Sequence, residues 1–333
     1  MKKILVIRFS SIGDIVLTSP VIRCLKQQLP EVEVHVLTKE SNRQLFDSNP
    51  HINKVYSFSE KRSLSEVTAL LKKEKYDFVV DLHKNLRSFR VKRALSVWSK
   101  SFPKLNFRKY LLVQFKWNIM PEIHIVDRYF EAVKPLGVKN DHEGLDFFIP
   151  KHEVFDPESL PLLFRNGYHA VVLGGQHKTK IFPAEKVIEV AQYLEKPIVL
   201  LGGPEDAERG EKIVLSLGEK ALNKCGKLSL FQSALIVKNA LSVLTNDTGL
   251  MHIAAAFRKN TVSVWGNTVP ELGMYPYMPG DEKRSVIIEI KPLKCRPCSK
   301  IGFKECPKGH FKCMNDHYSK KIAQELLFFG KEI

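Results

Sequence analysis

The feature that most constrains this chain is the alternation of short β-rich runs with longer amphipathic runs. In the first 80 residues, strands are predicted at 3–9, 33–37, 53–58 and 76–81, and helices at 14–28 and 64–73. A second series of strands is predicted at 168–173, 197–201, 240–245 and 261–265, with helices at 184–194, 207–217, 230–238 and 249–257. Such alternation is typical of a parallel sheet covered by helices on both faces.

Between the two series, the sequence predicts irregular structure over the basic stretch from Lys84 to Pro121 and a helix at about 125–134. The segment 150–161, with three prolines and polar filler, is the best candidate for a linker. The length of 333 residues suits two domains. We therefore expect an α/β fold with two Rossmann-like, doubly wound domains, 1–155 and 162–333, facing a central cleft.

The composition excludes several classes of protein. Hydrophobic residues make up 44% and charged residues 26%, which is the balance of a soluble globular protein. No apolar run approaches the roughly 18 residues that a membrane span needs. Arg8 interrupts the N-terminal apolar run after four residues, so a secretory signal is not expected. We expect a cytoplasmic protein whose six cysteines are reduced thiols or metal ligands.

The charge points to anionic partners. With 52 Lys+Arg and 36 Asp+Glu, the formal net charge is +16. The stretch from Lys84 to Pro121 contains ten basic residues, seven aromatic residues and no acidic residue. This combination fits a membrane surface or anionic acceptor, or single-stranded nucleic acid. It also fits a solvated face whose aromatic side chains turn into the core.

The loop after the first predicted strand is the first candidate site. It contains Ser10, Ser11, Gly13 and Asp14, and small residues there let the backbone approach a ligand beside a helix N-terminus. It has no GxGxxG pattern, which disfavours a dinucleotide. Asp14 is interpreted either as a helix N-cap or as a carboxylate that takes a proton from a hydroxyl.

Three later strands also end in loops suited to phosphate. Gly174 and Gly175 precede Lys178 and Lys180, so glycines are followed by cations that would neutralise phosphate oxygens. A second loop, 201–206, has an acidic pair that would accept bonds from ribose or complement a helix N-terminus. The third, 245–252, offers successive N–H groups at a helix start, or a plain helix cap. Together the loops predict a nucleoside-diphosphate site in the C-terminal half.

Four segments carry a resemblance to a known family: "KILVIRFSSIGDIVLTSPVIRCLKQQLP", "KTKIFP", "LGGPEDAE" and "NDTGLMHIAAA". In order and spacing they resemble glycosyltransferase family 9, the lipopolysaccharide heptosyltransferases, over nearly the whole chain. The resemblance implies a GT-B fold with an N-terminal acceptor-binding domain and a C-terminal nucleotide-sugar-binding domain. It also implies inverting, metal-independent transfer of heptose from ADP-heptose to an anionic, lipid-linked inner-core acceptor at the inner face of the cytoplasmic membrane, with no nucleic acid involved.

The resemblance also assigns roles to residues. Asp14 would be the general base, Lys180 the cation on the diphosphate, Glu205 the ribose ligand, and Thr248, Gly249 and Leu250 the backbone phosphate ligands. The remaining donor-site residues would be Ser10, Ser11, Gly13, Gly175, Gln176, Leu228, Asp247 and His252. The acceptor would be bound by His83, Lys84, Asn85, Arg87 and Arg128. At Gly175 and Gln176 the sequence departs from the family, which often has threonines there.

Two alternative functions remain open from the residues alone. One is another nucleotide-sugar enzyme, such as a hexosyltransferase or an epimerase. The other is a basic nucleic-acid-binding protein with a zinc knuckle, although the tail does not have a known nucleic-acid spacing.

The cysteine-bearing tail keeps three interpretations. Cys295, Cys298, Cys306 and Cys313 follow the spacing C-x2-C-x7-C-x6-C, with His310 and His317 nearby. They are reduced thiols in a loop, ligands of a structural zinc, or a redox pair. No cofactor is expected to be required for the reaction, and no catalytic metal site is predicted.

Overall fold

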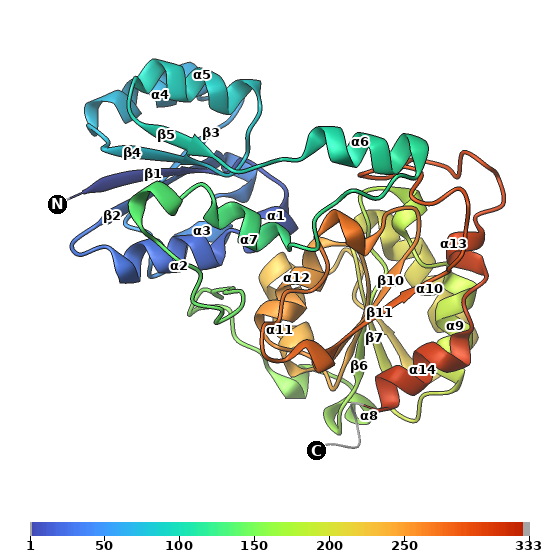
Figure 1. Ribbon diagram of the computed structural model, residues 1–333. Helices are drawn as coiled ribbons and strands as arrows, with labels where there is room; N and C mark the ends of the chain where they lie inside the picture. Colours follow the sequence, from blue (N-terminus) through green and yellow to red (C-terminus); the bar gives the residue numbers. More distant parts are fainter. Residues whose placement is uncertain (1, 329–333) are drawn as a thin grey trace. The chain divides into compact units, whose positions relative to one another are not determined.

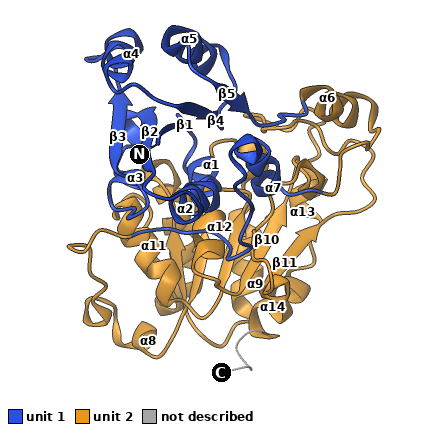
Figure 2. Cartoon of the chain, turned by 60° about the vertical axis from the view of Figure 1, so that its left-hand side comes forward, with its two compact units in different colours: residues 1–105, 123–148 blue, residues 106–122, 149–333 orange. Residues whose placement is uncertain are grey.

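The computed structural model describes residues 2–328 and divides into two compact units. Of the described residues, unit 1 comprises 2–105 and 123–148, and unit 2 comprises 106–122 and 149–328 (Figure 2). This division differs from the expected one, because residues 106–122 belong with the C-terminal part. Leu112 explains the assignment, since it packs against Val269 and Leu272 of unit 2.

Unit 1 is built on a five-stranded parallel sheet with the order β3-β2-β1-β4-β5. The strands are β1 (Lys3–Ile7), β2 (Glu33–Lys39), β3 (Lys54–Phe58), β4 (Phe78–Asp81) and β5 (Ser99–Ser101). The apolar residues of β1 are completely buried, as expected for a central strand covered on both faces. Figure 1 shows α4 and α5 on one face of this sheet and α2, α3 and α7 on the other.

The helices of unit 1 depart from the sequence prediction in several places, among them α7, which ends at Phe130 and not at about 134. They are α1 (Ile12–Val16), α2 (Ser19–Gln28), α3 (Gln44–Asp47), α4 (Leu64–Lys73), α5 (Leu86–Leu95) and α7 (Ile125–Phe130). The single helix expected at 14–28 is wrong, because the chain breaks after Val16 and restarts with Pro20 in the first turn of α2. Proline lacks the N–H that a continuous helix would need there.

The prediction of irregular structure over the basic stretch is also wrong. This stretch forms α5, β5 and, in unit 2, α6 (Asn106–Phe115). Asn85 starts α5 with a capping box, in which its side chain accepts from the Ser88 N–H and the Ser88 hydroxyl accepts from the Asn85 N–H. The many charges of α5 hid its apolar face, on which Val91 is buried.

Unit 2 contains a six-stranded parallel sheet with the order β11-β10-β9-β6-β7-β8. The strands are β6 (His169–Val172), β7 (Ile198–Leu201), β8 (Ala221–Asn223), β9 (Val243–Asn246), β10 (Thr261–Trp265) and β11 (Ser285–Glu289). The helices are α8 (Leu162–Arg165), α9 (Ala184–Gln192), α10 (Ala207–Leu217), α11 (Leu230–Asn239), α12 (Gly249–Ala256), α13 (Lys312–Asn315) and α14 (Ser319–Phe328). Figure 1 shows α9, α10 and α14 on one face of this sheet and α11 and α12 on the other.

Each unit therefore has the doubly wound α/β architecture that the sequence predicts. Since all strands of a sheet run parallel, their carboxyl ends share one edge, where ligands of such folds bind. The loops after β1 and β4 in unit 1, and after β6, β7 and β9 in unit 2, lie at these edges. No helix within residues 2–328 has both the length and the apolarity to cross a membrane.

Burial of His169 on β6 generates a prediction about pH. The ring bonds to the Ser242 hydroxyl at 2.8 Å, and burial lowers the pKa of His169 to about 4. Between pH 4 and 6.5 the unfolded chain binds a proton that the folded chain does not, so stability falls as the solution is acidified. His169→Gln, which cannot titrate, should lose about 2 kcal/mol less stability than the wild type between about pH 7 and pH 5. Urea unfolding at both pH values measures this difference, and parallel losses in the two proteins would contradict it.

Candidate active site

Asp14 lies at the carboxyl end of β1 and is held by two neighbours. Its Oδ1 pairs with Arg8 Nη2 at 2.6 Å, and its Oδ2 accepts a bond from the Ser11 hydroxyl at 2.7 Å. Arg8 is buried and also donates to the Tyr129 hydroxyl at 2.9 Å and to the Ser10 carbonyl at 2.8 Å. Burial opposes the charge of Arg8, but Asp14, with Tyr129 and Asp81, outweighs burial, so the pKa of Arg8 is raised. Arg8 and Ser11 thus fix the orientation of the Asp14 carboxylate.

The interpretation of Asp14 as a helix N-cap is wrong. Ser11 occupies the N-cap position of α1, and Asp14 is the third helical residue, whose Oδ2 reaches back to the Ser11 N–H at 3.3 Å. The Asp14 side chain remains partly exposed. Ser10 and Gly13 complete this loop and first turn.

The loop after β4 is organised by Asp81. Its Oδ1 accepts from the N–H groups of His83 (3.1 Å) and Lys84 (2.7 Å), and its Oδ2 pairs with Lys92 at 2.9 Å. Lys92 is therefore a structural cation within unit 1, although it is part of the basic stretch. The Asp81 carboxylate thus holds the backbone of His83 and Lys84, two of the expected acceptor ligands, in place.

The expected acceptor ligands differ in accessibility. Lys84 and Arg87 are exposed, whereas Arg128 is buried in α7, and burial lowers its pKa. Burial together with Arg8 lowers the pKa of His83 to about 4, so its ring is neutral at neutral pH. The carboxamide oxygen of Asn85 caps α5. Acceptor binding by these five residues remains a prediction.

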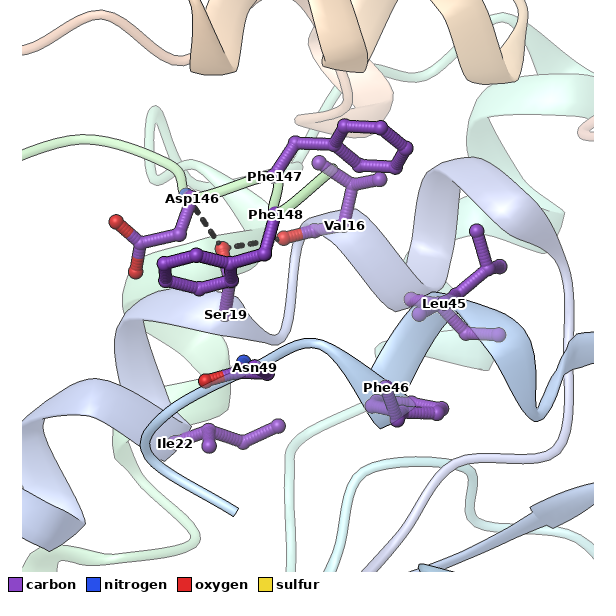
Figure 3. Close-up of a pocket in the computed structure, with 10 residues that line it drawn as sticks. Val16, Ser19, Ile22, Leu45, Phe46, Asn49, Asp146, Phe147 and Phe148 are labelled. Atoms are coloured by element: carbon purple, nitrogen blue, oxygen red, sulfur yellow. Dashed lines mark hydrogen bonds between the residues drawn. The ribbon is translucent and has the colours of Figure 1, made fainter. Parts of the chain in front are cut away.

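A small cavity in unit 1 lies between α1, α2, α3 and the segment Asp146–Phe148 (Figure 3). The Ser19 hydroxyl accepts from the Asp146 N–H at 2.8 Å and donates to the Val16 carbonyl at 2.7 Å, which ties that segment to the helices. The volume of the cavity, about 20 Å³, is enough for one water molecule and too small for a sugar. The cavity is not a substrate site.

In unit 2, the N-terminus of α12 has the geometry of an anion site. Thr248 is its N-cap, with extended backbone (φ −141°, ψ 174°), but its side chain makes no capping bond. The first N–H groups of a helix have no partner within the helix. In α12 these are the N–H groups of Gly249, Leu250 and the next residues, and the N-cap side chain does not cap them. Such groups, at the positive end of the helix dipole, favour phosphate.

Lys180 and Asp247 meet beside this helix start. Lys180 Nζ lies 2.5 Å from Asp247 Oδ2, and the side chains are only 16% and 12% exposed. The same oxygen accepts a bond from the Thr268 hydroxyl at 2.9 Å. The cation expected to bind a diphosphate is thus held by the residue that precedes the N-cap of α12.

Asn246 joins the ends of the strands around this pair. Its side-chain oxygen accepts from the Phe182 N–H at 3.1 Å, and its Nδ2 donates to the carbonyls of Val172 (3.2 Å) and Gly174 (3.3 Å). These bonds fix both ends of the loop after β6, residues 173–183, to β9. This loop carries Lys180 and the expected donor ligands Gly175 and Gln176, of which Gln176 is exposed.

The acidic pair after β7 divides into two roles. Asp206 is buried, accepts from the Gly203 N–H at 2.9 Å and pairs with Arg209 at 2.9 Å, so it is structural. Glu205 is exposed, and its carboxylate lies against Gly203, where an added Cβ would come within 2.4 Å of Oε2. Glu205 is thus the member of the pair that can contact a ligand. Leu228 is half-buried on the core of unit 2, and His252 is buried within α12.

The cysteine-bearing tail braces the loops of this site. The Arg296 guanidinium donates to the carbonyls of Gly266 (2.5 Å), Ile290 (2.8 Å) and Thr268 (3.0 Å), and pairs with Glu289 at 3.1 Å. A second bracing contact joins Phe303 to Thr179, whose hydroxyl accepts from the Phe303 N–H at 2.8 Å. The tail therefore holds both the Lys180 loop and the Thr268 loop.

The four tail cysteines are free thiols, and Cys295 Sγ lies 3.8 Å from His310 Nε2. Burial, followed by the charge of Cys295, raises the pKa of Cys298 to about 11. Across residues 2–328, no three His, Cys, Asp or Glu side chains are arranged to hold a metal ion. A structural zinc at Cys295, Cys298, Cys306 and Cys313 remains one of the three interpretations of the tail.

Comparison with known proteins shows the family of the chain. The sequence model of glycosyltransferase family 9 (heptosyltransferase) matches residues 65–307. The chain belongs to this family. It is therefore a glycosyltransferase, which confirms the resemblance noted in the sequence.

Relatives of known sequence or structure are similar to this chain over most of its length. Lipopolysaccharide heptosyltransferase 1 of Campylobacter coli is 24% identical over 292 residues, covering 80% of this chain and 84% of the relative. The solved family 9 glycosyltransferase of Veillonella parvula superimposes with a TM-score of 0.79 at 21% identity, covering 100% and 98% of the two chains. The E. coli heptosyltransferase WaaC with ADP superimposes with a TM-score of 0.69 at 21% identity, covering 98% and 99%. These structures confirm the GT-B fold class.

Sequence reasoning about this family 9 chain missed Arg8, Thr268, Asn246 and Arg296 as supporting residues. Arg8 carried a usable signal, since an arginine at the end of a buried strand needs an anionic partner nearby. Thr268 and Arg296 had none, because their contacts depend on how distant loops meet. Arg296 acts on carbonyl groups, which no side-chain pattern reveals.

The ion pair of Lys180 and Asp247 generates a paired prediction. Lys180→Met should weaken binding of a nucleoside diphosphate by about tenfold or more, because a charge-assisted bond to phosphate is lost. It should also cost about 2 kcal/mol of stability, because Asp247 loses its cation in a mostly buried place. The double variant with Asp247→Asn should regain stability but not binding. Calorimetry with ADP and urea unfolding separate the two effects, and recovered binding in the double variant would contradict the role of Lys180.

Arg296→Lys tests the bracing role of the tail. Lysine cannot donate to several carbonyls in a fixed fork, so the loop that carries Thr268 should loosen. We expect KM for the donor to rise by about tenfold with a smaller change in kcat. Arg165→Lys is a matched control, because Arg165 also donates to carbonyls, those of Leu160 (2.9 Å) and Glu158 (2.7 Å), on a different segment of unit 2. Equal effects on KM in both variants would show that the role of Arg296 is not specific.

Proposed function

We propose that this protein transfers heptose from ADP-heptose to an inner-core lipopolysaccharide acceptor. The observation that carries the proposal is the uncapped N-terminus of α12 beside the Lys180–Asp247 pair, which suits the diphosphate of such a donor. Relatives named as lipopolysaccharide heptosyltransferases, and the likeness to a heptosyltransferase with ADP, support the choice of sugar and nucleotide.

The leaving group determines what unit 2 must do. When the bond from the anomeric carbon to the diphosphate breaks, negative charge develops on the departing phosphate oxygens. Lys180 and the N–H groups at Gly249 and Leu250 would stabilise that charge without reorganising. Because these groups supply the positive charge, the proposed reaction needs no metal. The exposed carboxylate of Glu205 would accept hydrogen bonds from the ribose hydroxyls.

The attacking hydroxyl determines what unit 1 must do. Asp14 would take its proton while the hydroxyl attacks the anomeric carbon from the face opposite the diphosphate, so the configuration inverts. Pairing with Arg8 makes a carboxylate a weak base, and the fixed orientation of Asp14 must therefore supply much of the effect. His83, Lys84, Asn85, Arg87 and Arg128 would bind the anionic acceptor. We place this reaction at the cytoplasmic face of the membrane, with no role for nucleic acid.

Asp14→Asn tests the proposed base. The variant keeps the size of the side chain but cannot take the proton, so transfer from ADP-heptose should fall by about 100-fold or more. Binding of ADP should stay within about twofold, because unit 2 supplies the proposed phosphate ligands. Transfer by the wild type should persist in EDTA. The measurement is radiolabelled heptose transfer to an inner-core acceptor, alongside calorimetry with ADP.

Asp47→Asn provides the matched control for this test. Asp47 is an exposed helical carboxylate of unit 1 that also pairs with an arginine, Arg43, at 3.4 Å. It should leave transfer unchanged. Transfer by Asp14→Asn within about tenfold of the wild type would show that Asp14 is not the base. Transfer from UDP- or GDP-hexoses, but not from ADP-heptose, would overturn the proposed donor.

A further inference from the structure

The aromatic side chains of the basic stretch are mostly exposed. Of the seven aromatic residues between Lys84 and Pro121, only Phe102 is buried, against Tyr129. The others are exposed, namely Phe89, Trp98, Phe107, Tyr110, Phe115 and Trp117. The interpretation of this stretch as a solvated face with its aromatics in the core is therefore wrong.

The exposed residues are most concentrated on one segment of unit 2, residues 106–119, which we call the α6 segment. Phe107 is 70% exposed and Trp117 is 63% exposed, with Tyr110, Phe115 and Ile119 about half exposed. The aromatics contact one another: the ring centroids of Tyr110 and Phe115 are 6.1 Å apart, and those of Phe115 and Trp117 are 5.6 Å apart. This cluster is a preformed apolar surface, which isolated soluble domains rarely expose.

The α6 segment is anchored from its other side. Leu112 is only 5% exposed and packs on Val269 and Leu272, and Lys116 Nζ donates to the Pro297 carbonyl at 2.7 Å. The α6 segment therefore keeps its contacts with the core of unit 2 while its aromatic side chains are exposed. Figure 1 shows α6 at the upper edge of unit 2.

Its charges are all of one sign. Arg108, Lys109 and Lys116 are the ionisable side chains with a formal charge in the segment, and it contains no acidic residue. Cations beside aromatic side chains match the interface of an anionic bilayer, where rings lie at headgroup level and cations meet phosphate.

We propose that the α6 segment is a membrane-docking surface that inserts Phe107, Tyr110, Phe115 and Trp117 into the interface of an anionic phospholipid bilayer. This deepens the proposed function, because it names the surface that would bring the enzyme to a lipid-linked acceptor. Two features favour lipid over nucleic acid. The rings pack on one another instead of standing apart to receive successive bases, and Ile119 cannot stack on a base but can enter an interface.

Trp117 offers a direct probe. The chain has three tryptophans, of which Trp265 is buried, so Trp98→Phe leaves Trp117 as the exposed one. We expect the emission of this variant to shift to the blue when vesicles of phosphatidylcholine and phosphatidylglycerol are added without any nucleotide sugar. Brominated lipids should quench it. Vesicles of phosphatidylcholine alone should give a weaker response, and salt should weaken binding.

Vesicle sedimentation tests the residues themselves. Phe115→Ala with Trp117→Ala should weaken binding to the anionic vesicles by about tenfold or more, because two apolar side chains no longer enter the interface. The matched control is Tyr193→Ala with Leu215→Ala, two exposed apolar residues elsewhere in unit 2, and it should bind as the wild type does. Arg108→Gln with Lys109→Gln should weaken binding by about fivefold per charge at low salt.

The two proposals fail separately. Heptose transfer to a soluble, deacylated acceptor does not need a membrane, so it should be equal in the wild type and the Phe115/Trp117 double variant. If neither protein transfers heptose to this acceptor, the proposed reaction is contradicted and the docking surface is not. The docking surface is overturned if the wild type does not bind the anionic vesicles, or if the double variant binds them as tightly as the wild type. Tighter binding to a single-stranded RNA than to the vesicles would also overturn it.

Discussion

The candidate donor site depends on one ion pair, Lys180 with Asp247. An exposed pair of this kind contributes little, but these side chains are largely removed from water, so each charge would be costly without the other. The pair keeps a cation at a helix N-terminus, where an unpaired lysine would be opposed by the helix dipole. Asp247 thus makes it possible for Lys180 to remain close to the N–H groups that a phosphate would use.

The starts of α5 and α11 differ from that of α12, because their own side chains cap them. At the start of α5, Asn85 and Ser88 cap each other, and at the start of α11 the Ser229 hydroxyl accepts from the Gln232 N–H. After β7, the buried carboxylate of Asp206 accepts from Gly203. Those backbone donors are already satisfied by the chain itself. The Thr248 side chain makes no capping bond to the α12 backbone, so no side chain caps the first turn there.

Much of the fold could be predicted because periodicity reports directly on which faces are buried. The helices α4 and α10 and the strand β10 have the bounds that the sequence indicates. The edge strands β5, β8 and β11 were missed, since they are short or only half-buried and lack a continuous apolar run. The loop motifs likewise placed Lys180 and Asp247 in one site. Their direct contact across 67 positions, and the brace from Arg296, could not be predicted, because they depend on side-chain packing between loops.

The basic stretch shows where the same reasoning stops. The interpretation as a solvated face differed from the two binding interpretations in which way the aromatic side chains face, and composition carries no information on that. The fold decides it through the amount of covering structure available. Phe102 follows the edge strand β5 and finds Tyr129 to pack against, with ring centroids 4.8 Å apart. In the helix α6, Leu112 is the one buried residue. A helix with so narrow a buried contact cannot cover four rings, so their apolar area lies outside the core of unit 2.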